Sequence, residues 1–279
     1  MKSKYVPLLF ASSLAALAIT SPAFADNDTK LASIRSKGVM RVAITQTSPP
    51  WTYLGDDNQP AGYDVEVVKE VAKRMGVAKL EFVIDSYKNF VEGLEADKYD
   101  TVFNDLSPTK ERSLRVDFAE PYGVEDFRIF VKAGNKSIRG INDLKGKSVG
   151  VTTGSANEAW SISHLPGATI KGYDNGSFIF QDLNNGRLDA VIISHFGGLK
   201  YAKATNMGVE EASDPLTYSI AAPALRKGEP SLKAALSSAI KSMSGDGTLD
   251  SFAHRLTGVT YSITQAIATA QKEAAGESQ

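Results

Sequence analysis

Residues 100–122 read DTVFNDLSPTKERSLRVDFAEPY and place a polar loop between two short strands, predicted at 101–103 and 115–118. The loop and the helical turn after it carry side chains that can hydrogen-bond a small ligand: Asn104, Asp105, Ser107, Thr109 and Arg112. Arginine binds a carboxylate through two parallel hydrogen bonds, and nearby hydroxyl and amide groups complete the shell. The segment therefore predicts a site for a small carboxylate. Taken alone it also fits a solvated loop with a surface arginine, so the rest of the chain decides.

Strands and helices alternate on both sides of this segment, in two blocks. The first block is expected to hold strands at 39–44, 80–84 and 101–103 and helices at 64–75 and 87–97. The second is expected to hold strands at 148–151, 169–173 and 188–193 and helices at 155–165, 177–185 and 196–204. The last elements are an extended segment at 218–225 and helices at 230–243 and 248–256. Such alternation favours parallel sheets with helices on both faces, so the chain is expected to form two α/β lobes.

The helix at 64–75 carries clear end signals. Asp64 is expected to cap its first turn, because a side-chain oxygen at that position can accept a free backbone N–H. Gly76 ends the helix, and Lys73 and Arg74 complement the negative end of its dipole. The apolar residues share one face: Val65, Val68, Ala72 and Met75.

The first 25 residues have the pattern of a secretory signal peptide. Lys2 and Lys4 form a basic start, residues 6–20 are mostly apolar, and Ala23-Phe24-Ala25 is a small-x-small cleavage site. The apolar run is too short for a stable membrane span. The chain has no cysteine, so it has no disulfide framework and no cysteine for lipid attachment. These features predict a freely soluble exported protein and favour a bacterial periplasm.

Composition limits the possible partners. About 254 of the 279 residues remain after cleavage, which is enough for one large domain or two modest ones. The apolar fraction of 42% can fill a real core. The net charge is −1 and falls to about −3 once Lys2 and Lys4 are lost. Such a chain has no basic field to hold nucleic acid or an anionic membrane.

An ordered set of short motifs resembles a family 3 periplasmic solute-binding protein of an ABC importer, the polar amino-acid-binding type. In the first half they are VMRVAI at 39–44, PPW at 49–51, GYDVE at 62–66, AKRMG at 72–76, DTVFN at 100–104, SPTKER at 107–112 and VDFAEPY at 116–122. In the second half they are DLKGKSVGV at 143–151, GS at 154–155, GRLDA at 186–190, LRKG at 225–228 and DGT at 246–248. Asn104 and NEAW at 157–160 are similar to the cystine-binding branch.

This resemblance spans residues 31–258 and implies a two-lobed periplasmic-binding-protein fold. Residues 26–125 and 222–262 are expected to form a discontinuous first lobe, and residues 126–221 the second. Two crossing strands, near 124–126 and 219–222, would form the hinge. Residues 263–279, polar and rich in alanine, are expected to be a flexible tail, either a frayed helix or disordered.

The resemblance also implies roles for particular residues. Arg112 matches the arginine that binds the ligand carboxylate, and Ser107 matches a hydroxyl that contacts it. Tyr87 matches an aromatic that packs on the ligand, although core packing is an alternative for it and for Trp51. The first-lobe site is expected to comprise Trp51, Tyr87, Asn104, Asp105, Ser107 and Arg112. The second lobe is expected to add Ser155, Ala156 and Asn157, at a helix start that suits a carboxylate, and Ser194.

Ser194 marks a departure from the family pattern. The family has an aspartate there that pairs with the ligand's α-ammonium. A buried ammonium without a carboxylate is costly. Either Asp105 or Glu158 therefore supplies the charge, or the ligand is an opine, another N-substituted compound or a keto acid.

Enzymatic alternatives have weaker support in the sequence. The three histidines, His164, His195 and His254, lack zinc-binding spacing. Ser194 and His195 are neighbours on a strand, so their side chains would point to opposite faces. A cyclohexadienyl dehydratase resembles the same fold and lacks the amine-binding aspartate, which keeps it as the enzymatic alternative. The family function implies no enzyme activity, no cofactor and no metal. It implies a monomer whose partners are a small-molecule ligand and a membrane permease. A chemosensory role, in which the protein presents its ligand to a receptor, is the alternative to transport.

Overall fold

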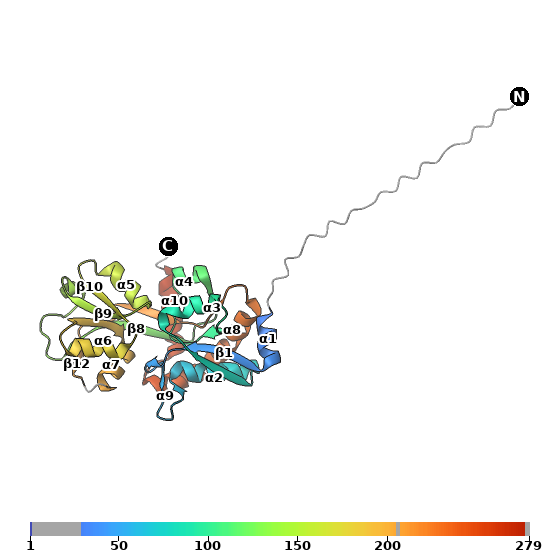
Figure 1. Cartoon of the computed structure of the whole chain (residues 1–279), viewed down its shortest axis with the longest axis horizontal. Coiled ribbons are helices and arrows are strands. Elements are labelled where there is room, and N and C mark those ends of the chain that lie inside the picture. Colours follow the sequence, from blue (N-terminus) through green and yellow to red (C-terminus); the bar gives the residue numbers. More distant parts are fainter. Residues whose placement is uncertain (2–28, 205–206, 277–279) are drawn as a thin grey trace.

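The computed structural model describes Met1, residues 29–204 and residues 207–276, and there the chain forms two α/β lobes side by side (Figure 1). The predicted two-lobed fold with mixed sheets is thus confirmed. The signal peptide predicted at 1–25 lies outside the described residues, apart from Met1. Within the described part, no helix combines the length and apolar character needed to cross a membrane.

The first lobe is built from both ends of the chain. Its early elements are α1 (Lys30–Lys37), β1 (Val39–Ile44), β2 (Thr47–Ser48), β3 (Thr52–Leu54), β4 (Pro60–Ala61), α2 (Tyr63–Met75), β5 (Lys79–Ile84), a 3-10 turn (Tyr87–Asn89), α3 (Phe90–Glu95), β6 (Thr101–Val102), α4 (Lys110–Arg115) and β7 (Val116–Phe118). Its late elements are β14 (Ala224–Arg226), α8 (Pro230–Gly245), α9 (Thr248–Thr257) and α10 (Ile263–Gly276).

The second lobe is built from the chain between them. Its elements are β8 (Gly123–Lys132), a 3-10 turn (Ile141–Leu144), β9 (Ser148–Thr152), α5 (Ala156–His164), β10 (Thr169–Tyr173), α6 (Gly176–Asn184), β11 (Ala190–Ser194), α7 (His195–Ala204), β12 (Val209–Glu211) and β13 (Thr217–Ala221).

Each lobe has a mixed sheet. In the first, the strand order is β5-β1-β6-β14-β7, with β1 parallel to β5 and β6, and β14 antiparallel to its neighbours. In the second, the order is β10-β9-β11-β8-β12, and β13 also pairs with β8. There β9 is parallel to β10 and β11, while β8 is antiparallel to all its partners. A small antiparallel sheet, β2-β3-β4, lies beside the first lobe.

The chain crosses between the two sheets twice. β7 is followed by β8 in the other sheet, and β13 is followed by β14 back in the first. β8 and β13 pair antiparallel from Phe127 with Thr217 to Gly123 with Ala221. The N–H of Tyr122 donates to the Ala221 carbonyl over 2.9 Å, just before the crossing. The two links are therefore held together, close to the predicted hinge; the lobe boundaries proposed from the sequence stay a prediction.

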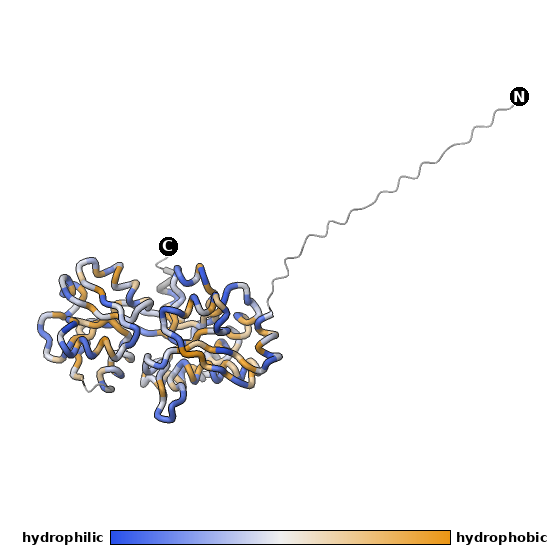
Figure 2. Tube along the Cα trace, in the orientation of Figure 1, coloured by the Kyte–Doolittle hydropathy of each residue, from blue (hydrophilic) through white to orange (hydrophobic). Residues whose placement is uncertain are grey.

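Helices cover both faces of each sheet and create an apolar core on each face (Figures 1 and 2). In the second lobe, Ile129 and Ile192 pack on the α5 side, whereas Phe130 and Val191 pack on the α6 and α7 side. This split follows from the alternation of side chains along a strand. In the first lobe, one core packs under α2, α8 and α9, and the other under α3. Because each lobe has its own apolar cores, each can move as a rigid unit.

The C-terminal segment is a helix over its described part, one of the two predicted alternatives, but it is packed against the protein and not a flexible tail. Residues 263–276 form α10, which packs against β8, β13 and α9. Ile263, Ile267 and Ala270 are buried in the core of the first lobe. These positions recur at helical spacing, so they form one apolar face. The polar, alanine-rich composition concealed this face because only a few apolar residues make it.

Asp64 also differs from its predicted role as a helix cap. Helix α2 begins at Tyr63, with Gly62 before it, and makes no side-chain cap hydrogen bond. The Asp64 side chain is completely buried. Burial, reinforced by the nearby charge of Asp105, raises the pKa of the Asp64 carboxyl well above its ordinary value.

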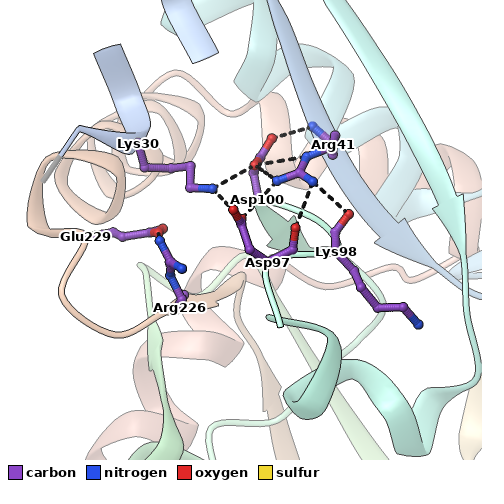
Figure 3. Close-up of polar contacts among 7 residues, drawn as sticks. All are labelled: Lys30, Arg41, Asp97, Lys98, Asp100, Arg226 and Glu229. Atoms are coloured by element: carbon purple, nitrogen blue, oxygen red, sulfur yellow. Dashed lines mark hydrogen bonds and ion pairs between the residues drawn. The ribbon is translucent and has the colours of Figure 1, made fainter. Parts of the chain in front are cut away.

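A network of ion pairs lies in the first lobe near the amino-terminal ends of β1 and β6 (Figure 3). The Asp100 carboxylate, 5% exposed, accepts the backbone N–H of Arg41 over 2.8 Å and its Nη2 over 2.7 Å. Lys30 Nζ lies 3.4 Å from the same carboxylate, and Asp97 pairs with both cations. A separate pair, Arg226 with Glu229, lies alongside. The network ties α1, β1 and β6 together.

Removing the Asp100 carboxylate should destabilise the protein. Asp100→Ala leaves Arg41 and Lys30 short of a partner at a largely buried position, so we expect a loss of about 3 kcal/mol in the free energy of unfolding. Urea denaturation followed by circular dichroism measures it. Asp56→Ala, at an exposed loop position, is the matched control and should change stability by less than about 0.5 kcal/mol. Equal stability of the two variants would contradict this role.

Candidate functional site

The carboxyl ends of strands from both lobes face one cleft. β1, β6, β9 and β11 end there, and open α/β sheets bind ligands beyond the carboxyl ends of their strands. A cavity of about 60 Å³ lies between the lobes at this point. A larger cavity of about 620 Å³ lies behind the crossing strands, between β8, β13 and α10, and none of the predicted ligand-binding residues lines it. The smaller cavity is therefore the candidate site.

The structure brings together nine of the ten residues predicted to bind ligand. The cavity is lined by Trp51, Tyr87, Asn104, Asp105, Ser107, Ser155, Ala156, Asn157 and Ser194. Arg112, the tenth, lies at its rim. Arg112 Nη1 donates to the Ser107 carbonyl over 2.9 Å and Nη2 donates to the Gly154 carbonyl, while the guanidinium carbon lies 5.5 Å from the centre of the Tyr87 ring. The roles of these residues in binding stay predictions.

Two buried N–H donors on the first lobe lack acceptors among the described residues. Asn104 Oδ1 accepts the N–H of Thr45 over 2.6 Å and the Thr52 hydroxyl over 2.7 Å, which leaves Nδ2 unpaired. Trp51 Nε1 is unpaired too, with its ring edge-on to Tyr63 at 5.5 Å. Buried donors normally have partners. A ligand oxygen would satisfy either of them.

The backbone of Asp105 is held in an unusual conformation by two tyrosines. Its φ is +50°, in the left-handed region that aspartate tolerates better than most residues. The Tyr87 hydroxyl donates to the Asp105 carbonyl over 3.1 Å, and the Asp105 N–H donates to the Tyr122 hydroxyl over 3.2 Å. Burial raises the pKa of Tyr87 to about 12, so its hydroxyl stays a donor. The Asp105 carbonyl thus already has one protein donor.

The second lobe presents the start of α5 to the cavity. The Ser155 hydroxyl caps this helix by accepting the N–H of Glu158 over 3.2 Å. The N–H groups of Ala156 and Asn157, in the first turn, have no partner within the helix and lie at its positive end. The Asn157 side chain donates to the Ile192 carbonyl over 2.7 Å, so it fixes α5 to β11. Backbone donors, more than the Asn157 amide, are available to an anion here.

Contacts across the cleft show that the lobes are closed on each other. Lys88 Nζ pairs with Asp174 over 2.9 Å, and the Tyr201 hydroxyl donates to the Thr47 carbonyl. Gly154 approaches the backbone of Lys88, and a Cβ added to Gly154 would lie 3.0 Å from the Lys88 Cα. The φ of Gly154 is +76°, which also favours glycine.

Sequence reasoning missed Glu125. This residue of β8 lines the cavity and is 2% exposed. Its carboxyl lies within hydrogen-bonding reach of the Asp105 carboxyl and of the Ser194 hydroxyl. By contrast Glu158, one of the two acids suggested for the ammonium, accepts the N–H of Gly154 over 2.6 Å and does not line the cavity. The sequence signal that could have identified Glu125 was an acidic residue within a strand whose sheet is expected to be covered by helices on both faces.

Burial controls the charge of the Asp105 and Glu125 pair. Burial raises the pKa of Asp105 to about 6, while a hydrogen bond from Glu125 and the Arg112 charge oppose the rise. Burial and the Asp105 charge raise the pKa of Glu125 well above its ordinary value. Burial and mutual repulsion thus both favour a proton on this pair of carboxyl groups, more strongly at Glu125 than at Asp105. In the part of the chain that the structure describes, no acidic, histidine or cysteine cluster is arranged to hold a metal ion.

Two α/β lobes linked by crossing strands, with a cavity between them where their strands end, define a protein that encloses a small ligand. The chain belongs to family 3 of the bacterial extracellular solute-binding proteins, since the model of that family matches residues 40–269. The resemblance drawn from the sequence motifs is confirmed.

Three proteins similar to this chain illustrate its membership of the family. The L-cystine-binding protein TcyJ of Escherichia coli (strain K12) is 31% identical over 229 residues, which cover 82% of this chain and 86% of TcyJ. The structure of an ancestral arginine-binding protein bound to glutamine is 34% identical with a TM-score of 0.75, and the match covers 80% of this chain and 99% of that one. The ancestral amino acid-binding protein AncCDT-1, a precursor of cyclohexadienyl dehydratase, is 30% identical with a TM-score of 0.75, over 81% of this chain and 99% of its own.

The raised pKa of Asp105 predicts a pH-dependent stability of the unliganded protein. A carboxyl whose folded-state pKa is raised favours folding most below its unfolded value, near 3.8, and this advantage is lost as pH rises through about 6. Relative to Asp105→Asn, the wild type should therefore lose on the order of 1–3 kcal/mol between pH 4 and 7. Urea denaturation at several pH values measures the difference. The exposed-loop control Asp56→Asn should show the same pH dependence as the wild type. If the difference in the free energy of unfolding between the wild type and Asp105→Asn does not change with pH, the burial of this charge is refuted.

Proposed function

We propose that this protein is the periplasmic substrate-binding protein of an ABC transporter, and that it captures a polar amino acid between its lobes and delivers it to a membrane permease. The cavity between the lobes, lined by donors and acids from both, carries the proposal. The ligands named for TcyJ and for the glutamine-bound ancestral protein support an amino acid as the class. The signal-peptide pattern at 1–25 supports a periplasmic location, and a monomer suffices for this role.

Capture would proceed in two stages. The ligand carboxylate first docks on the open first lobe at Arg112, whose planar guanidinium binds carboxylates bidentately. The second lobe then closes and adds the free N–H groups of Ala156 and Asn157. Closure is a hinge motion about the crossing strands. The contacts of Arg112 with Gly154 and of Lys88 with Asp174 join the two lobes, so opening the cleft would break them, and the permease would recognise the closed state.

A dehydratase activity on the same fold is not favoured. The similar ancestral protein is itself described as amino acid-binding and as a precursor of the enzyme. His195, next to Ser194 in the chain, pairs with Glu211 over 2.5 Å. None of the described residues that line the cleft cavity is a histidine. This geometry argues against a serine–histidine nucleophile at Ser194, the other enzymatic alternative.

Binding should stabilise and compact the protein. A ligand at 100 times its dissociation constant adds about 2.7 kcal/mol, which for a chain of this size raises the melting temperature by roughly 5–10 °C. A thermal-shift screen of L-cystine, L-cysteine, L-arginine, L-histidine, L-glutamine and matched keto acids identifies the ligand. Small-angle scattering should then show a smaller radius of gyration. Stabilisation without compaction would indicate binding to one lobe only and contradict capture between the two.

Arg112→Ala tests the carboxylate partner. Loss of one member of a buried charge pair costs about 2–5 kcal/mol, so affinity should fall roughly 30- to 5000-fold with the fold intact. Arg115→Ala is the matched control, because Arg115 lies on the same helix and pairs with Glu92 and Glu95 away from the cavity. Calorimetry that finds unchanged binding in Arg112→Ala would remove Arg112 from the site.

A further inference from the structure

One wall of the cleft cavity brings two acids and a serine together from different elements. Asp105 follows β6 in the first lobe, whereas Glu125 lies on β8 and Ser194 ends β11 in the second sheet. β8 pairs with β11, which places Ser194 opposite Phe127, two residues along the strand from Glu125. All three residues line the cavity. Closure of the lobes therefore determines how near the two carboxyl groups lie.

Beyond each other and the Ser194 hydroxyl, these acids lack the partners that buried carboxyl groups need. No hydrogen-bond donor among the described residues reaches Asp105 Oδ1 or Glu125 Oε1, and both atoms are buried. The Glu125 side chain is almost fully enclosed, at 2% exposure. A buried ionised carboxylate is costly unless it is paired. Each acid keeps one oxygen free at the cavity, where a ligand can supply the donors.

The neighbours of the pair do not neutralise it. The titratable and charged groups that face Asp105 or Glu125 are Asp64, Tyr87, Arg112, Tyr122 and Tyr261. Burial raises the pKa of the three tyrosines, so they are neutral near pH 7. The Arg112 guanidinium donates to two backbone carbonyls at the rim instead of to either acid. A net negative charge thus remains on the cavity wall.

We propose that Asp105 and Glu125 form the binding site for a positively charged nitrogen of the ligand, with the Ser194 hydroxyl beside it. An ammonium has three donors, which can satisfy both free carboxylate oxygens and one further acceptor. The site then accepts α-amino acids and N-substituted amino acids that keep a charged nitrogen, and it rejects keto acids. This inference rests on the proposed function and narrows its ligand class.

Matched ligands and isosteric variants test the site by calorimetry. The probes are L-cysteine and L-histidine, each compared with its des-amino analogue, 3-mercaptopropionate and 3-(imidazol-4-yl)propionate. Whichever amino acid binds the wild type should bind Asp105→Asn about 10- to 150-fold more weakly, the range for a charged hydrogen bond. Glu125→Gln should weaken binding to a similar extent, because an ammonium beside the Glu125 carboxyl lowers its pKa and favours its ionised form in the complex. The des-amino analogues should bind the wild type no more tightly than the amino acid binds these variants. Asp56→Asn, at an exposed loop position that does not line the cavity, is the control and should bind as the wild type does.

Acidity provides a second readout that a purely structural role would not change. Protonation of Asp105 removes the charge that holds the ligand nitrogen, so affinity should fall about tenfold from pH 7 to pH 5. Asp105→Asn should abolish this dependence. Melting of the unliganded variants checks their folding, and Glu125→Gln should not be less stable than the wild type at pH 8, because it removes a buried acid.

The outcomes separate this inference from the proposed function. If an amino acid binds and both variants bind it as tightly as the wild type, the ammonium site is wrong and the binding function stands. If a des-amino analogue binds as tightly as its amino acid, the ammonium site is also wrong. If no amino acid or related carboxylate of the thermal-shift screen binds at all, both proposals fail.

Discussion

The antiparallel pairing of β8 with β13 is the constraint on which the cleft depends. It places Glu125 opposite Ser219, whose hydroxyl contacts that of Ser107 on the first lobe. The same two strands lead to both crossings between the sheets. One ladder therefore sets the separation of the lobes and also forms a wall of the cavity. A rotation about these strands changes the distance between Asp105 and Glu125 directly, so ligand charge and lobe closure act on the same groups.

The charges around the cavity are arranged as two poles. Arg112 at the rim and the start of α5 supply the positive pole, and Asp105 with Glu125 supplies the negative one. A zwitterion whose carboxylate and ammonium are attached to the same carbon matches such a pattern. A compound with only one of these charges would leave the other pole unpaired, which is expensive inside a small cavity. Selectivity can thus arise from the charge of the ligand before its side chain is considered.

Much of the fold could be predicted because its signals are local. The alternation of strands and helices, Gly76 and the polar loop after β6 each act within a few residues, and the ordered motifs placed nine of ten site residues on one cavity. The failures involve contacts distant in sequence. Asp64 and Glu125 look like a helix cap and an ordinary strand acid until tertiary packing buries them. The few apolar residues of α10 have a core to pack against only once β8 and α9 are in place.

The strand order of the first sheet has a consequence for how the chain folds. β14 lies between β6 and β7, although the whole second lobe separates it from them in sequence. The second sheet is made of contiguous chain and can form early from its own contacts. The first sheet keeps open edges on β6 and β7 until residues 224–226 arrive, and contacts of such long sequence separation form slowly. Substitutions in β14 should therefore act mainly on the rate at which the native state is reached, and the half-finished first lobe is the species most exposed to aggregation.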